Sequence, residues 1–167
     1  EAIAIGETFG IHVQIVHLKL SGTDNWGGAD RLLGEIEAAR KRGVRLDCDQ
    51  YPYTAASNPL RNLLPLWVQE GGVELMLKRL ADAGVRARIR TELDARGLTS
   101  WGRIPSWQAV RVATAPHHPE LAGLTIEDIA KSRGCDPLDA VCDVLVDDRG
   151  ATRVLITSIS EDDASSP

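Results

Sequence analysis

The feature of the sequence that most constrains the fold is an alternation of helical and strand patterns in its first third. An apolar helical stripe stops at Gly10, and residues 11–20 form a short, β-branched run that is apolar on both faces, as in a buried parallel strand. A helical pattern at 29–42, ended by Gly43, leads to a second strand pattern at 44–54. This order predicts right-handed parallel crossover units, in a closed eight-stranded barrel or an open doubly wound sheet.

The pattern changes in the remainder of the chain. Residues 59–97 are predicted to be mainly helical, 98–107 to be a loop, and 108–115 to be a short strand. A final strand is predicted at 153–160, just before an acidic run. No internal repeat or low-complexity tract occurs in the sequence.

Two helix starts in this second part have clear local signals. Thr125 and Asp128 have the spacing of a capping pair and predict a helix that continues to Arg133. Asp136 is a typical N-cap residue and Pro137 is a typical residue of the first turn, so these two predict a second helix.

Composition excludes several classes of function. The 167 residues carry a formal net charge of −5, and no stripe of Lys and Arg is present, so we do not expect nucleic acid as a partner. No apolar run is long enough for a membrane span, and no signal-peptide pattern occurs. Three unpaired-looking cysteines, Cys48, Cys135 and Cys142, favour reduced thiols and a cytoplasmic location.

The strongest candidate for chemistry is the end of the first predicted strand. Alternation along a strand places Val13, Ile15, His17 and Lys19 on one face, with His17 and Lys19 at the carboxyl end, where α/β barrels bind ligands. Neutral imidazole is a good zinc ligand, and an ammonium group can bind a carboxylate. The alternative is a histidine hydrogen-bonded to a loop beside a solvated lysine.

The second predicted strand ends in a similar polar cluster. Asp47, Asp49 and Tyr51 would share one face, and Pro52 would end the strand. Charged side chains are costly inside a sheet unless they are paired or functional, and a tyrosine hydroxyl could orient a substrate oxygen. The alternative is that Asp49 pairs with an arginine and that the tyrosines only pack.

Other candidates are weaker. His117 and His118 are adjacent in a proline-flanked segment, so we expect them to be exposed to solvent and not to bind one metal ion together. Trp26 could line a pocket or simply pack. No Gly-x-Ser-x-Gly motif or comparable cysteine context supports a nucleophilic triad.

Taken together, the motifs resemble those of one enzyme family. His-Leu-Lys at 17–19, Asn-Trp-Gly at 25–27 and Asp-Gln-Tyr-Pro-Tyr-Thr-Ala at 49–55 are followed by Pro-Glu-Leu-Ala-Gly at 119–123 and Ser-Ile-Ser-Glu at 158–161. Their order is similar to that in the N-acyl-D-amino-acid deacylases, or D-aminoacylases, of the amidohydrolase superfamily. The resemblance extends along most of the chain.

The resemblance implies a fold and a set of roles. The family has a metal-bearing (β/α)8 barrel with a small β domain, and an insertion after the Tyr-Pro-Tyr strand. By resemblance, His17 corresponds to a metal ligand, Lys19 and Tyr51 to residues that hold the substrate carboxylate and nearby oxygens, and Ser158 to a residue near the substrate. Val16 departs from the serine that many relatives have there.

From this resemblance and the pattern of elements we expect three segments. Residues 1–57 would be part of the barrel, 58–150 a mainly helical insertion, and 151–167 a returning barrel strand with an acidic tail. Both chain ends resemble cuts within a larger protein, since Glu1 already lies in a helical pattern.

Much of the family's machinery is missing from this sequence. The His-x-His pair, the bridging Cys, a second strand-end His and the Asp of the Ser-Asp-Gly motif are absent, so no catalytic residue is assigned. We therefore expect zinc in the intact parent enzyme, no zinc on this chain alone, and no hydrolysis by the isolated chain. Self-association through exposed strand edges is a further expectation.

The expected reaction is hydrolysis of N-acyl-D-amino acids to a carboxylate and a D-amino acid. Two alternatives stay open: another amidohydrolase acting on a cyclic amide, and a non-catalytic α/β module that binds a partner. The Lys19 and Tyr51 pair favours a substrate with a free carboxylate, and metal content would separate the enzyme from the module.

Overall fold

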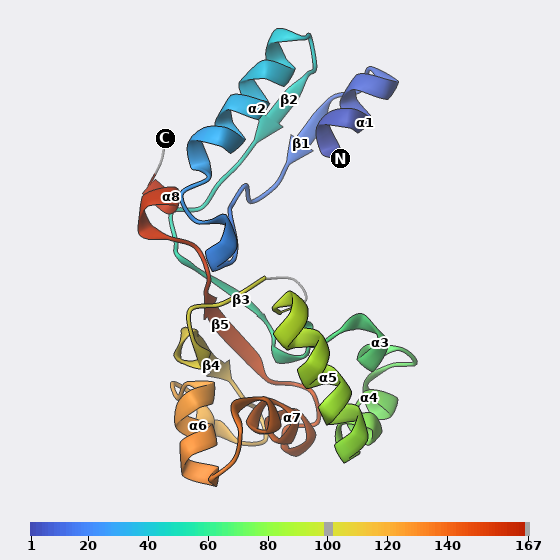
Figure 1. The fold of residues 1–167 in the computed structure, drawn as a ribbon, viewed down its shortest axis with the longest axis vertical. Helices are drawn as coiled ribbons and strands as arrows, with labels where there is room; N and C mark the ends of the chain where they lie inside the picture. The colour runs from blue at the N-terminus through green and yellow to red at the C-terminus, as the bar shows by residue number, and fades with distance from the viewer. Residues whose placement is uncertain (99–101, 166–167) are drawn as a thin grey trace. The chain divides into compact units, whose positions relative to one another are not determined.

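The computed structural model describes residues 1–98 and 102–165 and contains two compact units. The first unit comprises Glu1–Ser21, Asn25–Thr54 and the segment that begins at Ile159. The second comprises Gly22–Asp24 and Ala55–Ser158. The second unit is thus inserted in the chain between two parts of the first (Figure 1).

The first unit is a small α/β arrangement around two parallel strands. Its elements are α1 (Ala2–Phe9), β1 (Val13–Ile15), α2 (Ala29–Lys41), β2 (Leu46–Cys48) and α8 (Glu161–Ser165). Val13 pairs with Leu46 and Ile15 with Cys48, in parallel register. The prediction of two adjacent parallel strands joined by a helix is confirmed, although both strands are shorter than 11–20 and 44–54.

A small core holds the first unit together. Its core cluster of buried side chains consists of Ile36 and Ala39 of α2, Val44 just before β2, and Leu46 at the start of β2. Val13 and Ile15 of β1 pack against them, so the apolar face of the two strands is turned toward the helices. Four such side chains give little apolar burial, and this unit is therefore expected to be the less stable of the two.

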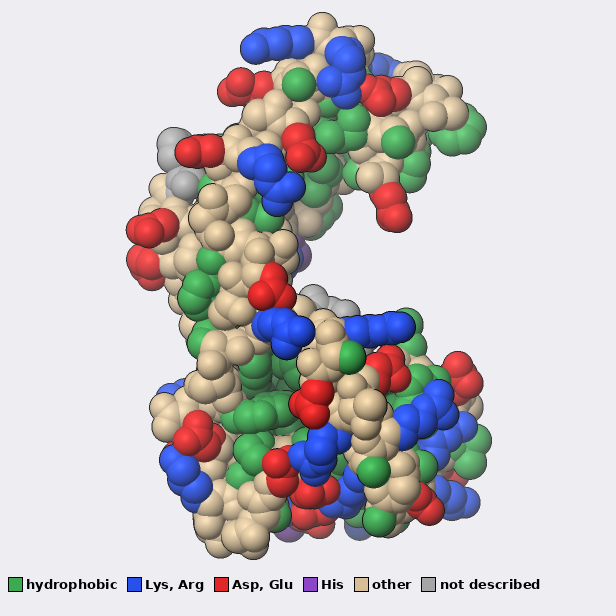
Figure 2. Space-filling model, in the orientation of Figure 1, with side chains coloured by type: hydrophobic (Ala, Val, Ile, Leu, Met, Phe, Trp, Pro, Cys, Tyr) green, Lys and Arg blue, Asp and Glu red, His purple; other side chains and the backbone are tan. Residues whose placement is uncertain are grey.

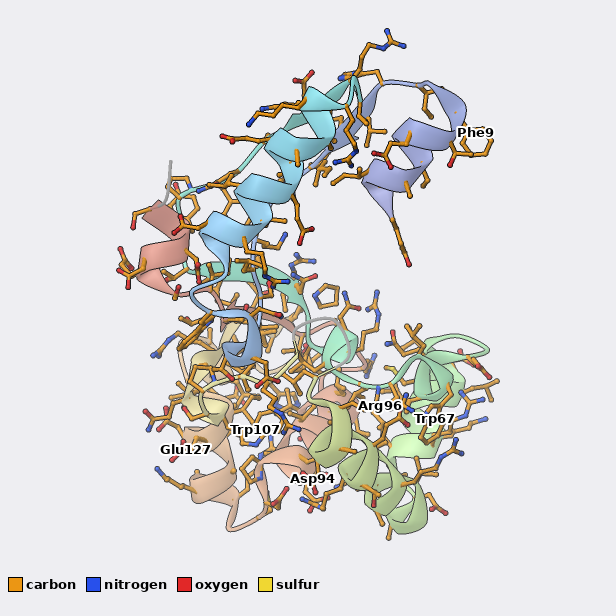
Figure 3. All side chains as sticks on the ribbon, turned by 45° about the horizontal axis from the view of Figure 1, so that its top comes forward. Phe9, Trp67, Asp94, Arg96, Trp107 and Glu127 are labelled. Carbon is orange, nitrogen blue, oxygen red and sulfur yellow. The ribbon has the colours of Figure 1, made fainter. Side chains whose placement is uncertain are left out.

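Helix α1 approaches the strands closely through a glycine. A Cβ atom at Gly6 would lie 2.8 Å from Cγ1 of Val44 and 3.1 Å from Cγ2 of Val13. The helix ends at Gly10, which has a left-handed φ of 62° and donates its N–H to the carbonyl of Gly6. The other face of α1 is open: Ile5 and Phe9 are 48% and 70% exposed, and Figure 3 shows Phe9 on the outer side of the helix.

The second unit is built on an antiparallel sheet with helices packed against it. The strands are β3 (Ala55–Pro59), β4 (Val110–Thr114) and β5 (Arg153–Thr157), in the order β3-β5-β4. The helices are α3 (Leu66–Gln69), α4 (Val73–Leu80), α5 (Ala83–Arg96), α6 (Ile126–Arg133) and α7 (Pro137–Asp147), with short 3-10 turns at Leu60–Leu63, Trp107–Ala109 and Pro119–Leu121. Helix α7 contacts α4, α5 and α6 and is the central helix of the unit.

The core of the second unit is much larger than that of the first. Leu60, Leu63 and Leu64 are fully buried after β3, and Val141 and Leu145 of α7 are fully buried beneath the other helices.

Both helix starts predicted in this unit are confirmed. The Thr125 hydroxyl accepts from the Asp128 N–H at 3.1 Å, and the Asp128 carboxylate accepts from the Thr125 N–H at 3.1 Å, which is a complete capping box. The Asp136 carboxylate accepts from the Leu138 N–H at 2.8 Å, with Pro137 in the first turn.

Other predictions for this part of the chain need correction. The segment 153–160 was expected to return to a barrel, but β5 pairs antiparallel with β3 and β4. The division at 57/58 and 150/151 differs from the compact units, because β3 and β5 belong together with the helices. The predicted loop at 98–107 contains residues 99–101, which lie outside the described residues; Leu98 and Gly102 on either side form a β-bridge.

Ion pairs connect α5 to α7. Arg86 lies 3.3 Å from the Asp139 carboxylate and 2.7 Å from that of Asp143, and Arg90 lies 3.1 Å from the second oxygen of Asp139. Figure 2 shows acidic and basic side chains interspersed over this unit. Among the described residues, no helix is long and apolar enough to cross a membrane.

Candidate functional site

The sequence predicted that the first strand continues to Lys19, but β1 ends at Ile15 in the structure. Strand pairing stops at Ile15, and His17 adopts a left-handed φ of 56°. The backbone N–H of His17 donates to Oδ1 of Asp49 at 2.7 Å, and the N–H of Leu18 donates to the backbone carbonyl of Asp49 at 2.7 Å. A turn held by Asp49 therefore takes the place of the predicted strand alternation.

This turn brings three of the predicted site residues together. The rings of His17 and Tyr51 meet edge to face, with centroids 5.4 Å apart. The ammonium of Lys19 lies 5.5 Å from the centroid of the Tyr51 ring and donates to the backbone carbonyl of His17 at 3.0 Å. The predicted convergence of His17, Lys19 and Tyr51 at the carboxyl ends of β1 and β2 is confirmed as geometry; their roles stay predictions.

Tyr51 is suited to donate a hydrogen bond. Burial raises the pKa of its phenol above the usual value, because the charged phenolate is less well solvated there. The hydroxyl is therefore protonated at neutral pH. Tyr53 lies 6.1 Å from Tyr51 between ring centroids and is 65% exposed, so it is accessible beside the cluster.

A small hollow in the same unit adjoins Lys19. Its polar lining comes from Lys19, Gln50 and Asp163, and its apolar lining from Leu18 and Leu32 among others. The hollow thus places a cation and a carboxylate beside apolar side chains, in a space of about 20 Å³.

Asp163 was expected to lie in an acidic tail and is instead held firmly in α8. Its carboxylate accepts from the N–H groups of Gly27 at 2.9 Å and Ala29 at 3.2 Å, at the start of α2. Burial alone would raise its pKa, but hydrogen bonds from Ser160 and from these amides outweigh that effect and lower it. Asp163 is therefore an ionised cap of α2, a long-range contact for which the sequence has no local signal.

Ser158 belongs to the second unit. It is fully buried directly after β5, and its backbone carbonyl accepts from the N–H of Gly22 at 2.8 Å. Its assignment to substrate binding stays a prediction.

The adjacent histidines have separate acidic partners. Nδ1 of His117 lies 3.2 Å from the carboxylate of Asp148, which is fully buried and also accepts from the Thr152 hydroxyl at 2.6 Å. Nδ1 of His118 lies 2.9 Å from Glu120. As expected, the two imidazoles do not converge on one point, and His117 is instead part of a turn-stabilising contact.

The described residues do not by themselves make a zinc site. Within residues 1–98 and 102–165, no group of three His, Cys, Asp or Glu side chains is arranged to hold a metal ion. Zinc in proteins takes three or four protein ligands, and His17 supplies one imidazole at most. No step through a metal can be derived from this part of the chain alone.

Comparison with known proteins gives consistent relatives. No family model matches the chain. N-acyl-D-glutamate deacylase of Alcaligenes xylosoxydans xylosoxydans is 24% identical over 140 residues, which cover 84% of this chain and 21% of that protein. The chain thus spans about a fifth of the length of this curated relative.

Solved structures agree with this relative in fold. The N-acyl-D-glutamate deacylase of Bordetella bronchiseptica, complexed with zinc and a phosphonate inhibitor that mimics the tetrahedral intermediate, matches with a TM-score of 0.62 at 22% identity. That match covers 97% of this chain and 25% of the other. A crystal structure of D-aminoacylase, said to define a novel subset of amidohydrolases, matches with a TM-score of 0.59 at 23% identity, over 98% of this chain and 25% of the other.

The chain is thus similar in sequence to a curated N-acyl-D-glutamate deacylase, and in fold to solved structures of an N-acyl-D-glutamate deacylase and a D-aminoacylase, in each case to a partial region of the other protein. The resemblance seen in the sequence motifs is confirmed by these neighbours.

Proposed function

We propose that this chain is part of a zinc-dependent amidohydrolase that hydrolyses the amide bond of N-acyl-D-amino acids to a carboxylate and a D-amino acid. The observation that carries the proposal is the convergence of His17, Lys19 and Tyr51 at the carboxyl ends of two parallel strands. The names of the relatives, which are deacylases of N-acyl-D-glutamate and D-aminoacylases, support it.

Each of the three side chains has a proposed role in the parent enzyme. The Lys19 ammonium binds the free carboxylate of the substrate, since it already has one acceptor, the His17 carbonyl, and has further N–H groups to donate. The protonated Tyr51 hydroxyl donates to a substrate oxygen beside it. His17 contributes one ligand to the metal, and the other ligands would come from residues outside this chain.

The parent fold is proposed to be a (β/α)8 barrel. The β1-α2-β2 segment has the parallel pairing and crossover helix of such a barrel. Open apolar surface on α1, at Ile5 and Phe9, and just after it, at Ile11, is consistent with a covering partner. In its absence we expect the isolated chain to self-associate through this surface and the open edges of β1 and β2.

The substrate chemistry distinguishes the proposal from its nearest alternative. An N-acyl-amino acid always presents a free carboxylate, whereas a cyclic amide need not carry one, so a cation beside a neutral phenol favours the N-acyl-amino acid. The free thiols Cys48, Cys135 and Cys142 are consistent with the proposed cytoplasmic location.

A non-catalytic partner-binding module is favoured by one observation, the lack of a three-ligand cluster in the described residues. Metal analysis of the parent protein separates the readings. A catalytic parent should hold zinc, and a binding module should hold none.

The test is an assay of the 167-residue chain and of a parent enzyme carrying this segment, each with added zinc, against N-acetyl-D-glutamate and other N-acetyl-D-amino acids. The parent should release acetate and the chain alone should not, because hydrolysis needs a metal-activated water and a base that this chain does not supply. In the parent, Lys19→Ala should raise KM by about ten-fold to a hundred-fold, the loss of one charge-assisted contact.

His12→Ala is the matched control for His17→Ala. His12 pairs with Asp47 at 2.8 Å and does not take part in the His17 cluster. We expect His17→Ala to abolish turnover and zinc retention while His12→Ala keeps both. Turnover by the isolated chain that His17→Ala leaves intact would contradict the proposed site.

A further inference from the structure

His17 has an uncommon backbone conformation for its residue type. Its φ of 56° lies in the left-handed region, which residues with a Cβ atom rarely adopt. Such a conformation persists only where surrounding contacts hold it, and it is found most often at functional sites. The contacts that hold His17 therefore matter to whatever His17 and its neighbours do.

The contacts converge on one residue, Asp49, through both its side chain and its backbone. Its Oδ1 accepts from the N–H of His17 at 2.7 Å, and its Oδ2 accepts from the side-chain amide of Gln14 at 3.3 Å. Its backbone N–H donates to the carbonyl of Ile15 at 3.1 Å, and its carbonyl accepts from Leu18 at 2.7 Å. Asp49 thus bonds to the chain on both sides of His17.

Asp49 bonds to the peptide groups on both sides of His17, and the second of these peptides, through the His17 carbonyl, also positions Lys19. The His17 carbonyl accepts from the Lys19 ammonium at 3.0 Å, and that ammonium lies over the Tyr51 ring. If the His17 peptide rotated, this acceptor would move and the ammonium would lose its fixed place. The contacts link Asp49 to Lys19 through the backbone of His17.

We propose that Asp49 is a positioning residue, which holds the left-handed turn at His17 and thereby places the Lys19 ammonium for the substrate carboxylate. The assignment of the carboxylate to Lys19 rests on the proposed function; the hold on His17 does not. Asp49 acts only through His17 and Lys19.

Asp47 is the matched control. It is an acidic residue two positions earlier, within β2, whereas Asp49 follows that strand, and its carboxylate pairs with His12 at 2.8 Å and with Arg40 at 3.7 Å. Removing it changes the charge of the strand by the same amount without touching the turn at His17.

The first experiment follows amide hydrogen exchange at His17 and Leu18 in the 167-residue chain by NMR. Asp49→Ala should speed exchange of the His17 amide by about ten-fold or more, since the amide loses its acceptor. Asp49→Asn keeps an oxygen acceptor and should stay within about three-fold of the wild type, as should Asp47→Ala. Equal acceleration in Asp49→Ala and Asp47→Ala, or none in either, would overturn the proposal.

A measurement on the unchanged protein covers the case in which Asp49→Ala fails to fold. A correlation across the hydrogen bond, from the His17 amide nitrogen to the Asp49 carboxyl carbon, is expected in a long-range NMR spectrum. Its absence, in a spectrum that shows the equivalent bond from Val85 to the Asp82 carboxylate in the cap of α5, would also overturn the proposal.

The second experiment uses the zinc-loaded parent and separates this inference from the proposed function. Asp49→Ala should raise KM for N-acetyl-D-glutamate about ten-fold with a smaller change in kcat, and Asp49→Asn should restore most of the loss. An unchanged KM in an active parent would refute the effect on Lys19. A wild-type parent without deacylase activity would refute the proposed function and the substrate role of Lys19, and the exchange data would still decide whether Asp49 holds His17.

Discussion

The two units of the molecule differ in how their structure is maintained. The second unit has a large apolar core around α7 and a network of ion pairs from α5. The first has a core cluster of four buried apolar side chains and a set of hydrogen bonds to backbone groups around Asp49 and Asp163. The candidate site residues His17, Lys19 and Tyr51 lie in the first. The candidate site residues therefore lie in the unit with less apolar burial. In that unit, hydrogen bonds contribute more than core packing to the positions of these side chains.

The largest expected effect comes from truncating the two cores. Leu145→Ala removes a fully buried side chain in the second unit and should lower the free energy of unfolding by about 2–5 kcal/mol. Ile36→Ala in the first unit should open that unit while leaving hydrogen exchange in the second unchanged. Denaturant unfolding and exchange by mass spectrometry measure both.

Leu66→Ala, at a position that is 73% exposed, is the control and should change stability by less than about 0.5 kcal/mol. If Ile36→Ala speeds exchange throughout Ala55–Ser158 as well, the second unit depends on the first and the comparison fails.

The thiols sharpen the comparison next. Burial raises the pKa of the Cys142 thiol from 9.0 to about 11. At neutral pH the thiolate of Cys142 is therefore about a hundred-fold scarcer than the thiolate of a cysteine with a pKa of 9.0. Cys48, in the first unit, is only partly buried. Alkylation followed by mass spectrometry should label Cys48 at least about a hundred-fold faster than Cys142.

Denaturant is the control for the thiol prediction. It should bring the rates of Cys48 and Cys142 within a few-fold of each other, because both thiols are then in water. Comparable rates in the native protein would mean that the core around α7 opens far more readily than its burial implies.

A smaller effect is expected from filling the contact between α1 and the strands. Gly6→Val would place side-chain atoms against Val44 and Val13, where a Cβ alone already comes within 2.8 Å, and should destabilise the first unit by about 1–3 kcal/mol. Gly34→Ala is the matched control in α2, because its Cβ would meet nothing within 4 Å. That substitution should stabilise the helix by about 0.5–1 kcal/mol. Thermal unfolding followed at α1 would measure both, and a neutral Gly6→Val would show that α1 is loosely docked.

The smallest effect concerns Asp163 and depends on pH. Because its folded-state pKa is lowered, its stabilisation is present above the unfolded value near 3.8 and is lost as the pH falls through the folded value. Asp163→Asn should therefore destabilise the first unit by less than about 1 kcal/mol at pH 7. This is at the low end of the effects of removing a helix cap, because solvent screens the carboxylate. Once the pH lies below the lowered pKa of the folded protein, the stabilities of the two proteins should converge.

Urea unfolding at several pH values, with Glu161→Gln on the same short helix as control, measures this difference. A deficit of Asp163→Asn that stays constant down to pH 2 would contradict a role for the ionised cap.

Local signals in the sequence were enough to predict much of the fold. The β-branched run around Val13 and the strand pattern around Leu46 predicted the parallel pair, and the capping residues Thr125 and Asp136 predicted where α6 and α7 begin. These succeed because each depends on residues only a few positions apart.

Features that depend on distant residues could not be predicted in this way. Strand β3 has the sequence Ala-Ala-Ser-Asn-Pro, which is poor in β-forming residues, and it is a strand because β5 pairs with it. It lies at the edge of its sheet, where Pro59 is tolerated. The capping of α2 by Asp163 likewise depends on residues that are far apart in the sequence.

The sequence predicted which residues make up the candidate site, but not the backbone conformation that brings them together. Strand alternation suggested that His17 and Lys19 share a face, whereas a left-handed turn at His17 brings them together. The sequence offered one clue that Asp49 holds this turn, because a carboxylate at a strand end needs a partner. Which partner it takes depends on the parallel pairing of β1 and β2.

The insertion of the second unit has a consequence for the order in which the chain assembles. The first unit is completed only when Ile159 donates to the carbonyl of Thr54 at 3.2 Å and Asp163 reaches α2, and these residues leave the ribosome after all of Ala55–Ser158. The pairing of Ala55 with Thr157 brings the two connections to neighbouring positions in one sheet. Folding of the inserted unit thus brings the two parts of the first unit together and reduces the loop-closure entropy that the first unit loses when it folds. During synthesis, the first unit, which carries the candidate site residues, therefore cannot be completed before the inserted unit has been made.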